Sequence, residues 1–400
     1  MPWNAHTTMS LRRELVLLAD QPGANVAEIA RRFGVSRKTA YKWLGRYRES
    51  GVDALADQPR TPHRSPNRTP PEVEDAVLRV RDKHPRWGGR KIQRVLVNEG
   101  LGDAPSPATV TAILRRHGRL GEPVPIQPMV RFEAEAPNDL WQMDHKGDII
   151  LGDGTRCFPL TVLDDHSRFS LCVHGQTSQK RGPVQDQLTA LFRRYGLPRR
   201  LLCDNGRPWA GAHRRTDIDG RSWPYYTRLA TWMMRLGITV VHCRPYHPQT
   251  QGKEERFHRT LKAEVLEDMD NGADFEDLAA CQAAFDDWRS IYNEVRPHDA
   301  LGLEVPASRY RVSPRAFPER VPEPEYDEGV VVRKVGKDGR ISLYGRVFRL
   351  GYGLSGHRVG LVPDGRDGVW KVYHGHQQIW LFDLADVDAR LDAKDGRRRL

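Results

Sequence analysis

The sequence predicts a multidomain α/β protein, with two small all-α domains at the N-terminus, an α/β core and a small β domain at the C-terminus. Three observations support this prediction. The chain has 400 residues, which is too many for one ordinary domain. Proline-rich stretches near residues 57–71, 120–137 and 312–325 divide it into segments. The apolar spacing is helical in the first segments, mixed in the core, and typical of short strands at the end.

The composition indicates a polyanionic partner and no membrane span. The formal net charge is +11 at pH 7 and the isoelectric point is about 9.5, which favours nucleic acid as the partner. No apolar stretch approaches the roughly 18–20 residues that span a bilayer. No secretory signal is evident at the N-terminus, so we expect a cytoplasmic protein. The five cysteines form no C-x-x-C pair, which argues against both a disulfide framework and a zinc site.

Residues 10–57 are predicted to form a helix-turn-helix domain. A helix over residues 11–18 and a second over 26–33 precede a glycine turn. Ser36 then provides a good N-cap for a third helix over residues 37–48. Small three-helix units also mediate protein contacts, but this third helix carries polar and basic side chains that can reach a DNA major groove. The candidate DNA contacts are Arg37, Lys38, Thr39, Tyr41 and Lys42.

A proline-rich arm leads to a second predicted helix-turn-helix domain, residues 72–118. The arm, residues 57–71, interleaves five prolines with arginines. It is either a plain spacer or an extended segment that follows a phosphate backbone or minor groove. In the second domain Ser106 is the expected N-cap of the last helix, which runs to His117. Two linked modules would raise each other's effective concentration on DNA. The candidate DNA contacts in the arm and this domain are Arg60, Arg64, Arg68, Arg90, Lys91, Thr109 and Arg115.

Residues 138–312 are predicted to form the α/β core. Apolar runs over residues 157–163 and 169–173 indicate neighbouring antiparallel strands joined by a tight polar turn. Asp164 and Asp165 in that turn are a possible extra acid pair, but we expect them to have a structural role. The remaining core elements are expected to be helices over 183–195, 225–235 and 275–292, and strands over 200–204 and 238–242.

The segment 242–262, HCRPYHPQTQGKEERFHRTLK, is predicted to change from a loop into a helix. Two prolines and a glycine exclude a regular helix before residue 253. Phe257, Leu261 and Val265 then recur at four-residue spacing and line one face of the helix. Glu255 shares a different stripe with Arg259 and Lys262. Such a run is often a solvated charged face, but a carboxylate within a basic stripe also suits a site that binds a metal and a polyanion.

Two aspartates stand at the ends of predicted core strands. Asp144 ends the run LWQMD, and Asp204 ends the run LLCD; polar or turn residues follow each of them. A strand end holds the backbone rigid while the side chain can reach solvent. Two such carboxylates and one from a helix form the all-oxygen ligand set that Mg²⁺ or Mn²⁺ prefers. Two ions held in this way activate a water or a 3′-hydroxyl and stabilise the leaving oxygen in phosphoryl transfer.

The segments WQMDHK, LLCDNG and HPQTQGKEERFHRTLK resemble the DDE transposase and retroviral integrase superfamily, in particular the integrase-core transposases of bacterial insertion sequences. The resemblance covers most of the chain. It implies a ribonuclease H-like fold for the core, with Asp144, Asp204 and Glu255 as catalytic residues and ligands of two Mg²⁺ or Mn²⁺ ions. The interval from Asp204 to Glu255 looks longer than is usual in such cores, and the polar stretch 211–222 is interpreted as a surface insertion beside the site.

Glu254 is the rival for the third acid. It falls on the helical face of Phe257 and Leu261, which is expected to pack inward, where a charge is costly unless it is paired. Glu255 is therefore the better-placed ligand, and the Glu-Arg-Phe pattern of the family agrees. His242, His247 and His258 are further possible ligands, but histidines in such a basic segment more often contact phosphate or nothing.

The C-terminal residues 326–386 are predicted to form a small antiparallel β-barrel. Six short β-rich runs separated by glycine-containing turns favour this fold. The runs are 330–335, 340–343, 347–350, 358–362, 369–373 and 379–383. Similar barrels follow integrase cores, where they bind DNA or a neighbouring subunit.

The residues and the resemblance together imply a DNA transposase. Its partner would be double-stranded DNA: terminal inverted repeats bound by the helix-turn-helix domains, and target DNA to which the core joins the cleaved strand. A homo-oligomer, dimer or tetramer, is implied because two element ends must be processed together. The expected location is the bacterial cytoplasm, at the nucleoid. Basic residues of the helix, Lys253, Arg256, Arg259 and Lys262, are hypothesised to position DNA near the metals.

Two alternatives remain open. One is a catalytically inactive, transposase-derived DNA-binding regulator, which would not need an intact acidic triad. The other is a metal-dependent nuclease without strand transfer, which only an assay of joining can separate from a transposase.

Overall fold

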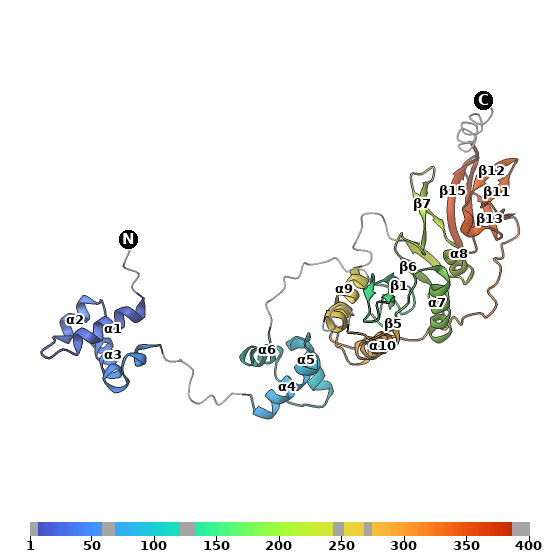
Figure 1. Ribbon diagram of the computed structural model, residues 1–400. Coiled ribbons are helices and arrows are strands. Elements are labelled where there is room, and N and C mark those ends of the chain that lie inside the picture. Colours follow the sequence, from blue (N-terminus) through green and yellow to red (C-terminus); the bar gives the residue numbers. More distant parts are fainter. Residues whose placement is uncertain (1–6, 58–68, 121–132, 243–251, 268–273, 386–400) are drawn as a thin grey trace. The chain divides into compact units, whose positions relative to one another are not determined.

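The computed structural model describes residues 7–57, 69–120, 133–242, 252–267 and 274–385 (Figure 1). The chain forms two compact units, Met1–Arg68 and Thr69–Leu400. In the described part of the chain, no helix is long and apolar enough to cross a membrane.

The first unit is a three-helix bundle, with helices α1 (Thr8–Ala19), α2 (Val26–Arg32) and α3 (Arg37–Ser50). As expected, Ser36 caps α3, because its hydroxyl accepts a hydrogen bond of 3.1 Å from the backbone N–H of Thr39. The buried side chains that hold the bundle together are Leu15, Val16, Ala30, Ala40 and Leu44. Packing through one face of α3 leaves its other face to solvent.

The second unit begins with another three-helix group, α4 (Pro71–Lys83), α5 (Gly89–Asn98) and α6 (Pro107–Arg116). Ser106 caps α6 through the N–H of Thr109, at 3.2 Å. The apolar stripes of the three helices meet in one cluster, which contains Val77, Trp87, Ile92, Leu96, Val110 and Ile113.

A mixed five-stranded sheet forms the core of the second unit, in the order β5-β4-β1-β6-β9. β1 is parallel to β6, and β6 to β9, whereas β4 is antiparallel to both β1 and β5. The bounds are β1 (Leu140–His145), β4 (Leu160–Asp164), β5 (Ser170–His174), β6 (Arg200–Cys203) and β9 (Thr239–His242). The strand expected over residues 157–163 is divided, because the short β2 (Ile149–Ile150) pairs with β3 (Arg156–Cys157), which ends before Pro159.

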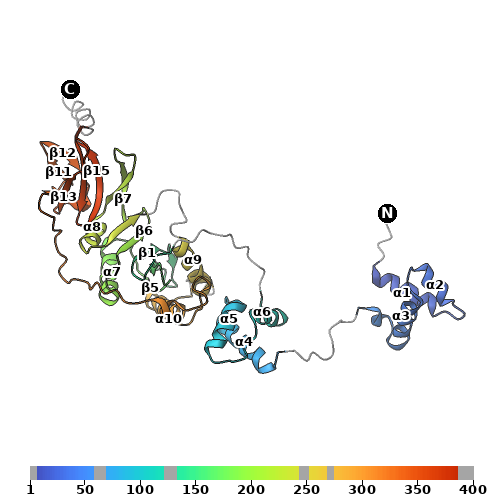
Figure 2. The same cartoon turned by 180° about the vertical axis from the view of Figure 1, so that it is seen from behind.

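Helices cover both faces of this sheet, as the opposite views in Figures 1 and 2 show. One face packs on α7 (Arg181–Tyr195) and α8 (Arg228–Arg235). The other packs on α9 (Gly252–Leu261), the π-helical turn η3 (Lys262–Leu266) and α10 (Leu278–Glu294). Side chains alternate along a strand, so Trp141 and Met143 of β1 enter the α7 cluster, and Asp144 projects toward α9.

The stretch predicted as a surface insertion is a β-hairpin. Its strands are β7 (Ala210–Thr216) and β8 (Ser222–Tyr226), paired antiparallel. The helix expected from residue 225 therefore starts later, at Arg228. Thr227 fixes this start, because its hydroxyl accepts a hydrogen bond of 3.2 Å from the N–H of Ala230.

The C-terminal strands lie close to their predicted positions, but the predicted small antiparallel β-barrel is not confirmed, because no closed barrel forms among the described residues. β10 (Val331–Lys334), β13 (Arg358–Pro363), β14 (Val369–His374) and β15 (Gln377–Asp383) form an open antiparallel sheet in that order, and β11 (Arg340–Leu343) and β12 (Arg346–Arg349) form a separate hairpin. Within the described residues no pairing joins the two edges of the sheet. The apolar faces of the open sheet and of the hairpin instead pack on one another and share one hydrophobic cluster with α8. Contact with the core therefore buries the apolar surface that a closed barrel would bury in its interior.

Candidate active site

The register of the parallel strands places Asp144 and Asp204 side by side. β1 and β6 pair as Leu140 with Arg200 through Gln142 with Leu202, a constant offset of sixty positions. The same offset aligns Asp144 with Asp204, which directly follows β6. Neighbouring strands lie about 4.8 Å apart, and equal register puts both side chains on the same face of the sheet. Two carboxylates are thus presented together at the carboxyl ends of parallel strands.

Helix α9 is fixed beside Asp144 by polar contacts with Thr161. Thr161 pairs with Asp144 across β4 and β1. Its hydroxyl lies 2.8 Å from Nε2 of His258 and 3.4 Å from Oε2 of Glu254. Glu254 is fully buried with Phe257 on this inward face, as the helical wheel predicts. Glu255, one residue on, is exposed.

The first turn of α9 is also tied to the acidic turn after β4. Nζ of Lys253 lies 2.5 Å from Oδ2 of Asp165. That carboxylate also accepts hydrogen bonds from the N–H of Ala134 and from Nε2 of Gln142, both at 2.6 Å. Asp165 therefore anchors the helix that carries Glu255.

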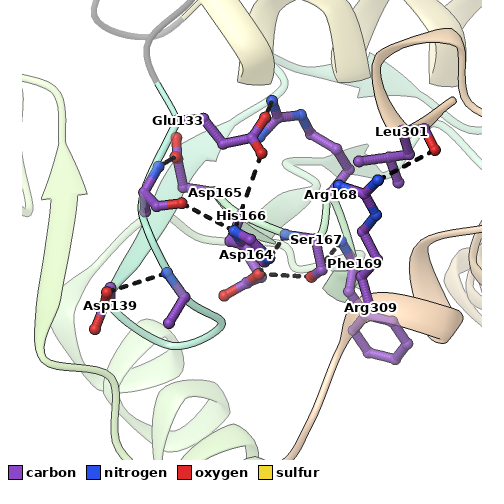
Figure 3. A network of polar contacts seen from close by, with 12 residues as sticks. Glu133, Asp139, Asp164, Asp165, His166, Ser167, Arg168, Phe169, Leu301 and Arg309 are labelled. Atoms are coloured by element: carbon purple, nitrogen blue, oxygen red, sulfur yellow. Dashed lines mark hydrogen bonds and ion pairs between the residues drawn. The ribbon is translucent and has the colours of Figure 1, made fainter.

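Asp164 has an equally complete set of partners, of which Figure 3 shows Ser167. Its carboxylate accepts from the N–H of Ser167 at 2.8 Å, from the hydroxyl of Ser167 at 2.5 Å and from the N–H of Asn138 at 2.8 Å. Arg168 of the same turn pairs with Glu133 at 2.8 Å. Both acids of this turn are fully buried, which agrees with the structural role expected for them.

Burial raises the carboxyl pKa of the strand-end aspartates and of Asp164 alike. Burial raises the pKa of Asp144 to about 6, and the negative charges of Asp204 and Glu255 act in the same direction, while a hydrogen bond from the N–H of His145 opposes them. Burial likewise raises the pKa of Asp204. The other two predicted acids are therefore within electrostatic range of Asp144. Such an arrangement favours the binding of positive charge.

Burial favours the neutral form of His145, His242 and His258 beside these acids. Burial lowers the pKa of His258 to about 3 and that of His145 to about 4. His242 contacts the backbone carbonyl of Asp204 through Nδ1, at 3.0 Å. His247 lies outside the described residues. These contacts orient the strand ends and α9.

The donor set at the strand ends fits a divalent cation. One oxygen of Asp144 accepts from the N–H of His145 at 2.8 Å, and one oxygen of Asp204 accepts from the N–H of Gly206 at 3.0 Å. Among the described residues the second oxygen of each accepts no hydrogen bond. Carboxylate oxygens of this kind are what Mg²⁺ and Mn²⁺ take as ligands. Within those residues no three His, Cys, Asp or Glu side chains are already close enough together to hold an ion.

The candidate DNA contacts of the first helix-turn-helix lie on the outer face of α3. Arg37, Lys38, Tyr41 and Lys42 are exposed, and Thr39 is half-buried because its hydroxyl meets that of Ser36 at 2.9 Å. In the part of the chain that the structure describes, none of the three cations forms an ion pair. This face is open to a polyanion.

The candidates of the second helix-turn-helix are placed less uniformly. Arg115 is exposed and Thr109 is half-buried against Ser106. Arg90 forms an ion pair with Asp299 at 3.0 Å, and burial lowers the pKa of the half-buried Lys91 to about 8. The candidates of the arm, Arg60, Arg64 and Arg68, lie outside the described residues.

The basic residues of α9 and η3 also differ in their exposure. Arg256, Arg259 and Lys262 are exposed. Lys253 is engaged with Asp165, and burial lowers its pKa to about 8. Its contact makes it an anchor of the helix start as well as a candidate DNA contact.

Several residues at this site carry no sequence pattern that predicts them. Thr161 and Gln142 have ordinary strand positions, and only the sheet pairing brings them to the acids. The cations of the β7–β8 hairpin are visible in the sequence only as charge within the insertion GAHRRTDIDGRS. Arg214 of this hairpin donates to Oδ1 of Asn205, the neighbour of Asp204, at 2.9 Å.

Models of five known domain families match successive parts of the chain. A helix-turn-helix domain matches residues 11–63 and a homeodomain-like domain residues 39–114. Integrase core domains match residues 134–248 and 236–306. The C-terminal domain of the IS481 family of transposases matches residues 330–390.

Individual proteins also resemble the chain. The insertion element IS476 39.2 kDa protein of Xanthomonas euvesicatoria is 32% identical over 43% of this chain, and the alignment spans 44% of that protein, less than half its length. The insertion element IS407 31.7 kDa protein of Burkholderia multivorans is 28% identical over 63% of this chain and 89% of its own. Among solved structures, the catalytic core of HTLV-2 integrase in complex with magnesium aligns over 45% of this chain and 100% of its own, with 14% identity and a TM-score of 0.32.

Proposed function

Because the chain belongs to the insertion-element transposases that carry an integrase core, we propose that it is an active DNA transposase. It binds the terminal inverted repeats of a mobile element, cleaves a DNA strand there and joins the freed 3′-hydroxyl to target DNA. The observation that carries this proposal is the aligned pair Asp144 and Asp204, each with a carboxylate oxygen that accepts no hydrogen bond from the described residues and suits a cation.

The proposed catalytic residues are Asp144, Asp204 and Glu255, which would hold Mg²⁺ or Mn²⁺, two ions in the full reaction. Bound there, the cations supply activation of the attacking water or hydroxyl and neutralisation of the leaving oxygen. The strand register holds the two aspartates in place, and the contacts of Lys253, Glu254 and His258 hold the start of α9 against the sheet. Little rearrangement of the aspartates is then needed when DNA arrives.

The proposed partner is double-stranded DNA. The exposed cations of α3 and Arg115 of α6 suit the element ends, and Arg256, Arg259 and Lys262 suit the DNA beside the acids. Joining of two ends to one target requires at least two copies of the core, so a dimer or tetramer on DNA is part of the proposal. The place of action is the cytoplasm, at the nucleoid.

A strand-transfer assay tests the proposal. The substrate is the DNA that flanks the gene, with Mg²⁺ or Mn²⁺ present, and wild type is compared with Asp204→Asn, Glu255→Gln and Glu254→Gln. We expect joining in the wild type, its loss in Asp204→Asn and Glu255→Gln, and its retention in Glu254→Gln. Cleavage without joining would replace the proposal with a metal-dependent nuclease. Tight end binding without metal-dependent chemistry would replace it with a DNA-binding regulator.

A further inference from the structure

A cavity of about 1030 Å³ lies between the β7–β8 hairpin and the C-terminal β domain. One wall is made by the hairpin and by the loop before α7, and the other by the end of β12 and the 3₁₀ turn η6 (Tyr352–Leu354). The volume is that of a site for a small organic group, and too small for a DNA duplex. Neither the carboxylates nor the helix-turn-helix faces are part of this cavity.

The charge of the cavity is of one sign. Its lining contains cations from five separate segments of the chain, namely the start of α7, the loop after β6, β7, α8 and β12, and, among the described residues, no aspartate or glutamate. Arg181, Arg207, Arg228 and Arg349 are all exposed, and none of them forms an ion pair in the part of the chain that is described. Like charges gathered without counter-charges repel one another, and an anionic ligand removes that cost. Planar guanidinium groups are well suited to phosphate oxygens.

Aromatic rings stand among these cations. Tyr352 is 60% exposed, so its ring is accessible to a ligand. Tyr225 and Phe158 contribute to the same lining, and the guanidinium of Arg349 lies 5.5 Å from the ring of Tyr352. An exposed ring, here that of Tyr352, beside guanidinium groups without counter-charges is a combination that binds unpaired nucleotides, because every base has a face that can stack and every nucleotide carries a phosphate.

The two walls are held rigidly to each other. Arg215 of β7 is buried; it donates to the carbonyl of Arg349 at 2.8 Å and lies 4.0 Å from the ring of Trp380. Gln377 of β15 makes paired hydrogen bonds of 2.9 Å with the N–H and the carbonyl of Val240, on the edge strand of the core sheet. Gly353 packs so closely on β8 that an added Cβ would lie 2.0 Å from the carbonyl oxygen of Tyr226. The cavity is therefore built into the fold.

The cavity also adjoins the strand-end aspartates. Arg214 of the lining donates to Asn205, which follows Asp204. Phe158 of the lining donates its N–H to the carbonyl of Gln176 at 2.7 Å, and Nε2 of Gln176 lies 2.8 Å from Nε2 of His145, which follows Asp144. The residue after each aspartate is thus connected by hydrogen bonds to the cavity wall.

We propose that this cavity binds an unpaired nucleotide of the DNA at the reaction centre, with its base stacked on Tyr352 and its phosphate held by Arg228 and Arg349. The proposal rests on the proposed function for the source of the DNA. A base can reach the rings only after it leaves the duplex stack, so the cavity would favour DNA that is frayed beside the cleavage point. Holding one strand here separates it from the strand whose end is joined.

Fluorescence anisotropy with two labelled DNAs tests this inference. One is a blunt duplex of arbitrary sequence, and the other is the same duplex with six unpaired thymidines on each strand at one end. Binding is measured without divalent metal, so that no cleavage occurs. We expect wild type to bind the forked DNA about tenfold more tightly, which corresponds to about 1.4 kcal/mol.

Matched variants locate the effect. Arg228→Glu/Arg349→Glu and Tyr352→Ala should lose most of the preference for forked DNA and retain binding to the blunt duplex, whereas Tyr352→Phe should keep the preference. The control, Arg320→Glu/Arg358→Glu, reverses two exposed arginines that do not line the cavity, and it should behave as wild type. Circular dichroism and thermal melting of each variant identify any loss of folding.

A photocrosslink provides a second readout that does not depend on affinity. 5-Iododeoxyuridine at the unpaired positions of wild-type complexes should crosslink to peptides that contain Tyr352 or Tyr225. Equal binding of the two DNAs by wild type, or crosslinks confined to other peptides, would overturn the inference. An unchanged fork preference in Tyr352→Ala and in the double charge reversal would also overturn it.

These outcomes are separable from those of the strand-transfer assay. Joining by a wild type that shows no fork preference would leave the proposed function intact and reject the cavity. A fork preference lost in the cavity variants, in a protein that never joins DNA, would keep the cavity and reject the transposase.

Discussion

Two pairs of aspartates lie in the same sheet, and their surroundings are opposite. Asp164, the last residue of β4, and Asp165, which follows it, are fully buried, and their carboxylate oxygens accept hydrogen bonds from backbone, hydroxyl, amide and ammonium groups. Asp144 and Asp204, at the ends of β1 and β6, are only partly buried, and each accepts one hydrogen bond from a nearby backbone N–H.

The difference separates structural acids from acids available for chemistry. A buried carboxylate is costly unless the protein supplies its partners, and the turn pair has them all. At the strand ends burial is opposed by few hydrogen bonds and raises the pKa of Asp144 to about 6. Burial also raises the pKa of Asp164, but there hydrogen bonds from Ser167 and Asn138 oppose it. Such unbalanced charge is typical of functional sites. The following predictions test this distinction.

The largest effect is expected from loss of a strand-end carboxylate. Asp144→Asn or Asp204→Asn should lower the single-turnover rate of strand transfer by about 10³-fold or more, since removal of even one charge-stabilising hydrogen-bond donor can cost about 10²–10³. Thermal unfolding of the metal-free variants should stay at or above that of wild type, because the substitution removes an uncompensated charge. Asp186→Asn, on the exposed face of α7, is the control. A large loss of stability in Asp144→Asn would remove the distinction between the pairs.

A substitution in the turn pair should act on stability first. Asp165→Asn leaves the largely buried ammonium of Lys253 without its carboxylate, so urea unfolding should show a loss of about 3 kcal/mol. Adding Lys253→Met should recover part of that loss, because the two residues are coupled. If Asp165→Asn unfolds at the same urea concentration as wild type and yet lacks strand transfer, the turn pair takes part in the reaction.

The pH dependence should reveal the raised pKa of Asp144. This group binds a proton below pH about 6 in the metal-free protein, and a protonated carboxyl is a poor metal ligand. The apparent affinity for Mg²⁺ should therefore fall about tenfold per pH unit below about 6, because each ion that binds must displace that proton. Higher Mg²⁺ should move the midpoint of activity to lower pH. Titration calorimetry from pH 5 to 8 measures the affinity, and a value that stays constant down to pH 5 would contradict the prediction.

The raised pKa also has a stability consequence with a definite sign. The folded protein holds the proton of Asp144 more tightly than the unfolded chain does, so this group stabilises the fold fully below pH about 4, the ordinary pKa of an aspartate. That contribution is lost as the pH rises through about 6. The difference in unfolding free energy between wild type and Asp144→Asn should change in this window.

The smallest effect is expected at Glu254. Burial raises the pKa of this carboxyl well above its usual range, which favours the neutral acid, and glutamine closely matches the neutral acid in shape. Glu254→Gln should change stability by less than about 1 kcal/mol, as a well-matched replacement of a neutral buried group does, and strand transfer by less than about threefold. Its neighbour Glu255→Gln is the comparison, and equal losses in both variants would show that the helical wheel does not distinguish the two acids.

Much of the architecture could be predicted from the sequence. Serine caps define the starts of α3 and α6, and the C-terminal strands lie close to the runs of alternating residues. The helix-turn-helix groups and the integrase core fit the expected fold, including a ribonuclease H-like order of strands. These features are local, because caps, turns and periodicity act within a few residues.

The structure differs from, or adds to, the predictions where tertiary contacts override local pattern. The expected barrel is an open sheet and a hairpin because its apolar surface is covered by α8 and the core. The insertion after Asp204 is a hairpin because Arg215 and Gly353 give it a partner more than a hundred residues away. Tyr225 therefore belongs to β8 and not to the following helix.

Residue type and helical spacing are enough to identify the acids, their order along the chain and the face of α9 on which Glu255 lies. Which acids stand together, and which have all their partners, depends on the folded chain. The alignment of Asp144 with Asp204 depends on the register between strands sixty residues apart, and the full pairing of Asp165 depends on Lys253 and Gln142. Long-range register and packing carry no local sequence signal. The distinction between structural carboxylates and those available to bind a cation is therefore set by the tertiary structure.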